Sequence, residues 1–145
     1  MMMCEVTRGI TMEQWLDEAA CMAMVCTDLI DGGGDVDPTV GMRGVGLAAA
    51  TIWRTTNGEP AWGKLDVEEL RRATRAAGMD EGWQDMVLVV VCAFYGFLEQ
   101  HGLVAWEQTR PIIDALAPYA EPATKRIMAR VGAGARAAVA PSRLN

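Results

Sequence analysis

The feature that most constrains this chain is a run of thirteen residues without a charge, MVLVVVCAFYGFL, at positions 86–98. Thirteen residues are too few to cross a bilayer, which needs about twenty. An apolar segment of this length in a chain that is 22% charged belongs in a protein core. Its β-branched stretch VLVVV would also suit a strand, and periodicity alone does not decide between the two. Its length, the EQHG ending and the helical neighbours favour a central helix over residues 81–101.

Capping signals predict two further helices. Thr11 and Gln14 stand three residues apart, as in a capping box, and Asp66 and Glu69 repeat that spacing. In each case the acceptor side chain at the first position can satisfy the free amides of the first helical turn. Helices are therefore predicted at residues 11–30 and 66–77.

The stretch DGGGDVDPTVGMRGVG, residues 31–46, looks like a ligand-binding loop. As a calcium loop that begins at Asp31 it would need glycine at the sixth position and glutamate at the twelfth, where Val36 and Met42 stand. Residues 44–49 match the dinucleotide fingerprint G-x-G-x-x-A, but they follow a helix start instead of a strand. We therefore interpret the three glycines as a helix stop and Asp37-Pro38 as the start of the next helix.

That next helix is predicted to run from Pro38 to about Thr55. Gly41, Gly44 and Ala48 would give it a shallow surface on which a second helix can approach closely. Each interior glycine costs roughly 0.5–1 kcal/mol relative to alanine, so the helix depends on its packing partners.

The C-terminal third is divided by Pro111, Pro118 and Pro122. Proline suits the first turn of a helix better than its interior. Short helices are therefore predicted at 104–109, 111–117 and 122–131, the last closed by Gly132. The resulting fold is an all-α single compact bundle of about five to seven helices around the central helix. Residues 1–132 form the domain, with 1–10 flexible, and 133–145 form a basic, Ala-rich, frayed tail.

The sequence argues against catalysis. His101 is the single histidine, and its place near the end of the central helix predicts a capping role. The four cysteines form no C-x-x-C, and no nucleophile elbow, P-loop or H-E-x-x-H motif occurs. We predict a protein that is not an enzyme and that has no cofactor and no metal site.

Charge is unevenly distributed along the chain. Residues 1–37 hold eight acids and one base, whereas residues 122–145 hold five bases and no acid. With a net charge of −6 and an isoelectric point near 4.7, direct binding to nucleic acid is not expected. The first residues contain no apolar signal segment, which predicts a cytoplasmic protein with reduced thiols.

These features favour a non-enzymatic regulator or inhibitor that binds another protein with a basic surface, of the kind that phage and mobile elements encode. Anti-defence inhibitors and immunity proteins are examples of the class. Trp62 lies in a predicted loop, where it either covers the core or meets the partner. Arg71, Arg72 and Arg75 give the helix at 66–77 a basic face. The candidate partner-binding residues are Glu13, Asp17, Glu18, Asp28, Trp62, Arg71 and Arg75.

Two alternatives remain open. The first is self-association, as a homodimer or larger helical oligomer, through the glycine-rich face of residues 41–48 or the basic tail. The second comes from residues 85–104, DMVLVVVCAFYGFLEQHGLV, which resemble the core-binding domain of tyrosine recombinases, where an apolar helix ends in a Gly-Leu turn. That resemblance implies a small DNA-associated helical domain. No residue of a recombinase active site is matched.

Overall fold

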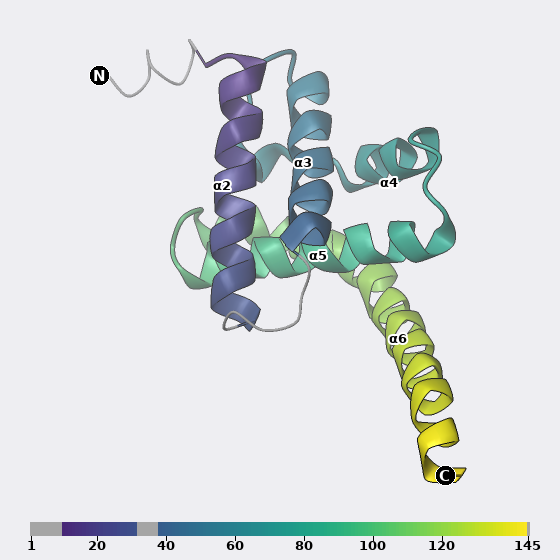
Figure 1. Cartoon of the computed structure of the whole chain (residues 1–145). Helices are drawn as coiled ribbons and strands as arrows, with labels where there is room; N and C mark the ends of the chain where they lie inside the picture. The colour runs from purple at the N-terminus through teal and green to yellow at the C-terminus, as the bar shows by residue number, and fades with distance from the viewer. Residues whose placement is uncertain (1–9, 32–37, 145) are drawn as a thin grey trace.

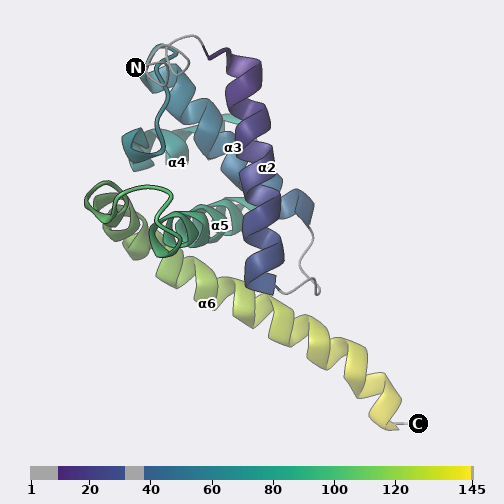
Figure 2. The ribbon, with the colours of Figure 1, turned by 90° about the vertical axis from the view of Figure 1, so that its left-hand side faces the viewer.

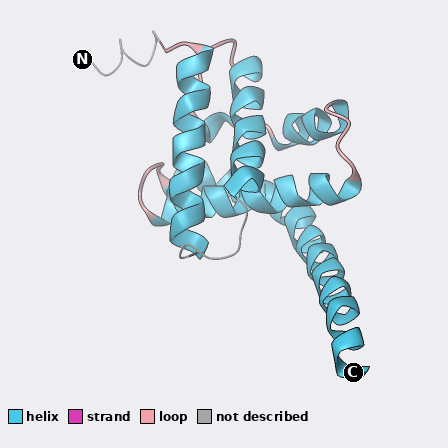
Figure 3. Cartoon of the chain, in the orientation of Figure 1, coloured by secondary structure: helices cyan, strands magenta, loops and turns pink. Residues whose placement is uncertain are grey.

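The computed structural model describes residues 10–31 and 38–144. Over these residues it contains five α-helices, one short 3-10 helix and no strand, which confirms the predicted all-α fold (Figure 3). The elements are α2 (Met12–Asp31), α3 (Pro38–Thr55), η1 (Trp62–Lys64), α4 (Val67–Ala76), α5 (Glu81–Gln100) and α6 (Trp106–Leu144).

α5 is the central helix, as the apolar run predicts. It contacts α2, α3, α4 and α6, and it crosses the lower ends of the paired helices α2 and α3 (Figure 1). By length and composition alone, its twenty residues could also cross a membrane. In the bundle, however, the helix buries one broad face among its neighbours, which accounts for its apolar character. The buried hydrophobic residues of that face are Val87, Leu88, Val91, Phe94, Tyr95, Phe97 and Leu98.

The predicted helix starts are confirmed by their hydrogen bonds. The Thr11 hydroxyl oxygen accepts from the amide of Gln14, and the Gln14 side chain accepts from the amide of Thr11. Asp66 caps α4 by accepting from two amides of the first turn. Asp80 caps α5 through the amide of Trp83. These local contacts set where each helix begins, because they satisfy amides that have no partner inside the helix.

The glycines of α3 pack inside the chain. A β-carbon at Gly41 would lie 2.8 Å from the Thr27 hydroxyl of α2, and one at Gly44 would lie 2.9 Å from Val90 Cγ1 of α5. The predicted close helix approach is therefore confirmed, and the dinucleotide fingerprint is ordinary helix. Gly41, Gly44 and Ala48 are buried within the bundle.

The prediction for the C-terminal third is wrong. One helix, α6, runs from Trp106 to Leu144 through every proline at which a break was expected, and it does not end at Gly132. Its exposed prolines face away from a buried stripe at helical spacing that lies along α5. Packing of this stripe offsets the lost backbone hydrogen bonds. The stripe consists of Ile112, Leu116, Ala120 and Ala123.

Residues 133–144, predicted as a frayed tail, are also helical in backbone conformation. They continue the axis of α6 and project beyond the bundle (Figures 1 and 2).

Candidate functional site

The outer side of α2 carries most of the acidic residues that the sequence singles out. The inner side of this helix is buried through Trp15, Ala19 and Cys26, which recur at spacings of four and seven. The remaining arc therefore faces solvent. We define the acidic face of α2 as its exposed residues Glu13, Asp17, Glu18, Cys21, Met24 and Val25.

This acidic face combines unpaired charge with exposed apolar surface. Among the described residues, Glu13, Asp17 and Glu18 take part in no ion pair. α2 itself contains no basic residue. Met24 and Val25 on the same side are 49% and 51% exposed. Met24 and Val25 follow Asp17 and Glu18 by seven residues, two turns along the same side of the helix, so this face presents both exposed apolar surface and uncompensated carboxylates.

Two of the sequence-predicted residues do not add to this face. Asp28 lies in the α2 backbone, but its side chain lies outside the described residues. Trp62 is only 8% exposed, and its ring centroid lies 4.5 Å from that of Trp15 and 4.9 Å from that of Phe94. The interpretation of Trp62 as a cover on the core is confirmed, and its assignment to a partner-binding surface is corrected.

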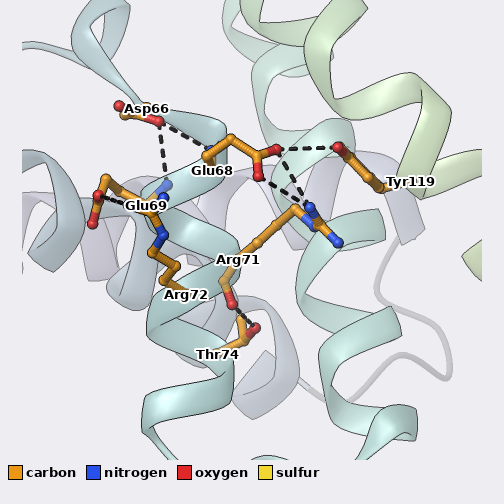
Figure 4. A network of polar contacts seen from close by, with 7 residues as sticks. All are labelled: Asp66, Glu68, Glu69, Arg71, Arg72, Thr74 and Tyr119. Carbon is orange, nitrogen blue, oxygen red and sulfur yellow. Dashed lines mark hydrogen bonds and ion pairs between the residues drawn. The ribbon is translucent and has the colours of Figure 1, made fainter.

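Arg71 and Arg75 lie on a different part of the molecule. They are one turn apart on α4, which contacts α3, α5 and α6 but, within the described part of the chain, not α2. The Arg71 guanidinium lies 3.9 Å from the ring centroid of Tyr119 on α6 and forms an ion pair with Glu68. The Tyr119 hydroxyl donates to Glu68, so three side chains from two helices hold one another (Figure 4). The predicted partner-binding residues thus divide between two separate surfaces.

A cleft of about 440 Å³ opens between α4, α5 and α6, beside the contact of Arg71 with Tyr119. One wall contains Asp85, a carboxylate that is only 4% exposed. Arg126 donates to both oxygens of Asp85, over 2.9 and 2.7 Å, and Arg130 donates over 2.9 Å. These hydrogen bonds, that from Arg126 foremost, lower the pKa of Asp85 although burial opposes the shift.

Sequence reasoning missed Asp85, Tyr119 and Arg126 in this cleft. Asp85 carries the one available signal, since a charged residue at the edge of a thirteen-residue apolar run must find a partner when it is buried. The identity of that partner is not readable from the sequence, because Arg126 lies 41 residues further along the chain.

His101 and Cys92 are side chains of kinds that often react in proteins. His101 is the C-cap of α5 and is exposed, with its ring centroid 4.9 Å from that of Phe97. Burial, together with the charge of Glu121, raises the pKa of the Cys92 thiol and so disfavours the reactive thiolate. Within residues 10–31 and 38–144, no three His, Cys, Asp or Glu side chains gather as metal ligands would.

No protein-family model, curated protein or solved structure matches this chain at a significant level.

Proposed function

We propose that this protein acts without catalysis, by binding another protein that carries a basic surface, and that the acidic face of α2 makes the contact. The observation that supports the proposal is the combination on one helix of unpaired Asp17 and Glu18 with half-exposed Met24 and Val25. Carboxylates without compensating bases steer a basic partner toward the helix. The apolar pair then contributes roughly 1 kcal/mol per side chain when the partner covers it.

The mode of action that fits such a face is regulation or inhibition. A partner with a basic surface commonly uses it to bind nucleic acid or another polyanion. Occupation of that surface by an acidic helix competes with the polyanion. DNA association, which the recombinase resemblance implies, is not favoured by this chain, because a helix with five acids and no base repels a phosphate backbone.

The proposal is tested with charge reversals at matched net charge. In Asp17→Lys/Glu18→Lys the charge of the acidic face changes from −3 to +1, because Glu13 remains, whereas the control Asp114→Lys/Glu121→Lys makes the same change in net charge on α6. All four residues are exposed, and α2 does not contact α6 among the described residues. A third variant, Met24→Ser/Val25→Ser, removes the apolar part.

Each variant is used to capture partners from lysate of the source cells at low and high salt. A specific partner should be retained by wild type and by the α6 control. Its affinity should fall by about tenfold or more in the α2 double reversal and in the apolar variant. Higher ionic strength should weaken the wild-type complex. An affinity that is equal for both double reversals, or flat across the salt series, refutes the proposed contact.

Self-association through the basic tail is the second candidate. It is favoured by the continuation of α6 to Leu144, which projects from the bundle within a segment of five bases and no acid (Figure 2). Such a helix is complementary in charge to the acidic face of a second copy. Light scattering at micromolar concentration distinguishes the two candidates, because a monomer excludes self-association and leaves the heterologous contact standing.

A further inference from the structure

The cleft between α4, α5 and α6 is lined in part by Arg75, whose side chain forms no ion pair or ring contact within the described residues. Every other arginine whose side chain is described has an acidic or aromatic partner. Arg75 has none, although it lines the cleft together with Arg71 and Arg126. The cleft lining thus contains three guanidinium groups and the two carboxylates of Glu81 and Asp85, which is a net positive charge on a protein whose overall charge is −6.

The neighbouring arginines are held in place, yet they keep donors to spare. Arg71 uses Nη1 toward Glu68 while its guanidinium lies over the ring of Tyr119. Arg126 uses Nε and Nη2 toward Asp85. A guanidinium has five N–H donors in a fixed fork, so both retain N–H groups for a further acceptor. With the partners Arg130 and Glu68 included, four guanidinium groups stand against the carboxylates of Glu68, Glu81 and Asp85, so the site keeps a net charge of +1.

The other walls of the cleft suit a small molecule. Its volume of about 440 Å³ falls within the usual range of small-molecule sites, roughly 300–1,000 Å³. Leu88, Pro118 and Pro122 supply apolar surface. Gln84 and Glu81, in the first turn of α5, can meet hydroxyl or amine groups. That first turn is also the positive end of the α5 dipole, which favours an anion nearby.

We propose that this cleft binds a small phosphate monoester, with Arg75 and Arg71 on the phosphate and the remainder of the ligand against Leu88, Pro118 and Pro122. Phosphate fits better than a single carboxylate because it carries up to two charges and three free oxygens, which the two guanidinium groups, one turn apart on α4, can share. The Glu81 carboxylate on the same wall selects for a ligand that also brings a hydrogen-bond donor. The site is independent of the acidic face of α2.

The first measurement uses inorganic phosphate against sodium chloride at matched ionic strength. Phosphate should raise the melting temperature and shift amide resonances at the end of α4 and the start of α5. Ribose 5-phosphate should bind more tightly than inorganic phosphate, whereas ribose should not bind. If ribose 5-phosphate produces no shift that chloride does not also produce, the phosphate site is excluded.

The matched variants are Arg75→Gln and Arg72→Gln. Both residues are exposed on α4, but Arg72 pairs with Glu69 and does not line the cleft. Arg75→Gln should weaken ribose 5-phosphate binding by about 10- to 100-fold, as expected for a charge-assisted hydrogen bond, and Arg72→Gln should leave it unchanged. Because Arg75 has no partner within the described residues, its substitution should not unfold the protein. Equal losses in both variants would show a diffuse charge effect and overturn the site.

Discussion

Two alanine substitutions within α3 test the packing of the bundle with a built-in control. Gly44 and Gly46 lie two residues apart in the same helix, so alanine brings the same gain in helix propensity at each, about 1 kcal/mol. A β-carbon at Gly46 would meet no heavy atom within 4 Å. A β-carbon at Gly44 would lie 2.9 Å from Val90 Cγ1 and 3.3 Å from Val90 Cβ.

Only one of the two substitutions should therefore raise the free energy of unfolding. Gly46→Ala should stabilise the protein by about 1 kcal/mol. At Gly44 the same gain is opposed by overpacking, which costs about 1–3 kcal/mol in a well-packed interface. Val90 cannot easily turn away, because a β-branched side chain has one strongly preferred rotamer in a helix. Gly44→Ala should thus leave stability unchanged at best and lower it by up to about 2 kcal/mol.

Urea denaturation followed by circular dichroism measures both effects. Thermal denaturation followed by the same signal should separate the melting temperatures of the two variants by about 4 °C for each kcal/mol in a chain of this size. Val90→Ala supplies a further check, since Gly44→Ala in that background should recover most of the propensity gain. If Gly44→Ala stabilises the wild-type protein as much as Gly46→Ala does, α3 does not meet α5 at this point and the arrangement of the bundle is wrong.

Two further predictions concern buried polar groups. Asp85→Asn should destabilise the protein at pH 7, because Asp85 accepts from Arg126 and Arg130 as a carboxylate. The pKa of Asp85 is lowered from its ordinary value of 3.8, so its contribution to stability is present above that value and declines as pH falls toward the folded pKa. Urea denaturation across this acid range checks this, because the difference between Asp85→Asn and wild type should shrink as pH falls below the ordinary value. A difference that stays constant would contradict it. Tyr95→Phe should cost about 1–3 kcal/mol, because the buried Tyr95 hydroxyl donates to the Trp62 carbonyl, which is left without that donor. Thermal denaturation followed by tryptophan fluorescence measures the loss, and an unchanged melting temperature would show that η1 is not held by this bond.

The parts of the fold that were predictable are those whose energetics are local. The caps at Thr11, Asp66 and Asp80 depend on side chains within three residues of the amides they satisfy. Likewise, the apolar run at 86–98 requires burial wherever the rest of the chain lies. Such features depend only on residues that are close in sequence, and together they predict an all-α fold with one central helix.

α6 shows where local reasoning fails. The cost of an interior proline is a property of a few residues, and it predicts breaks at Pro111, Pro118 and Pro122. The compensating energy comes from Leu116 and its neighbours against α5, which is a contact between distant segments. Local penalties of a few kcal/mol are outweighed when a long helix buries a continuous stripe.

The candidate cleft shows the same division between sequence and structure. Arg71 and Arg75 were identifiable as a basic face from their spacing on α4. Tyr119 meets Arg71 across 48 positions of the chain, and Arg126 meets Asp85 across 41. The sequence by itself determined which segments are helical at their starts, which helix is central and where the charges stand. Only the tertiary structure decided which charges are paired and which remain free, because pairing depends on the distance between helices that no local spacing encodes.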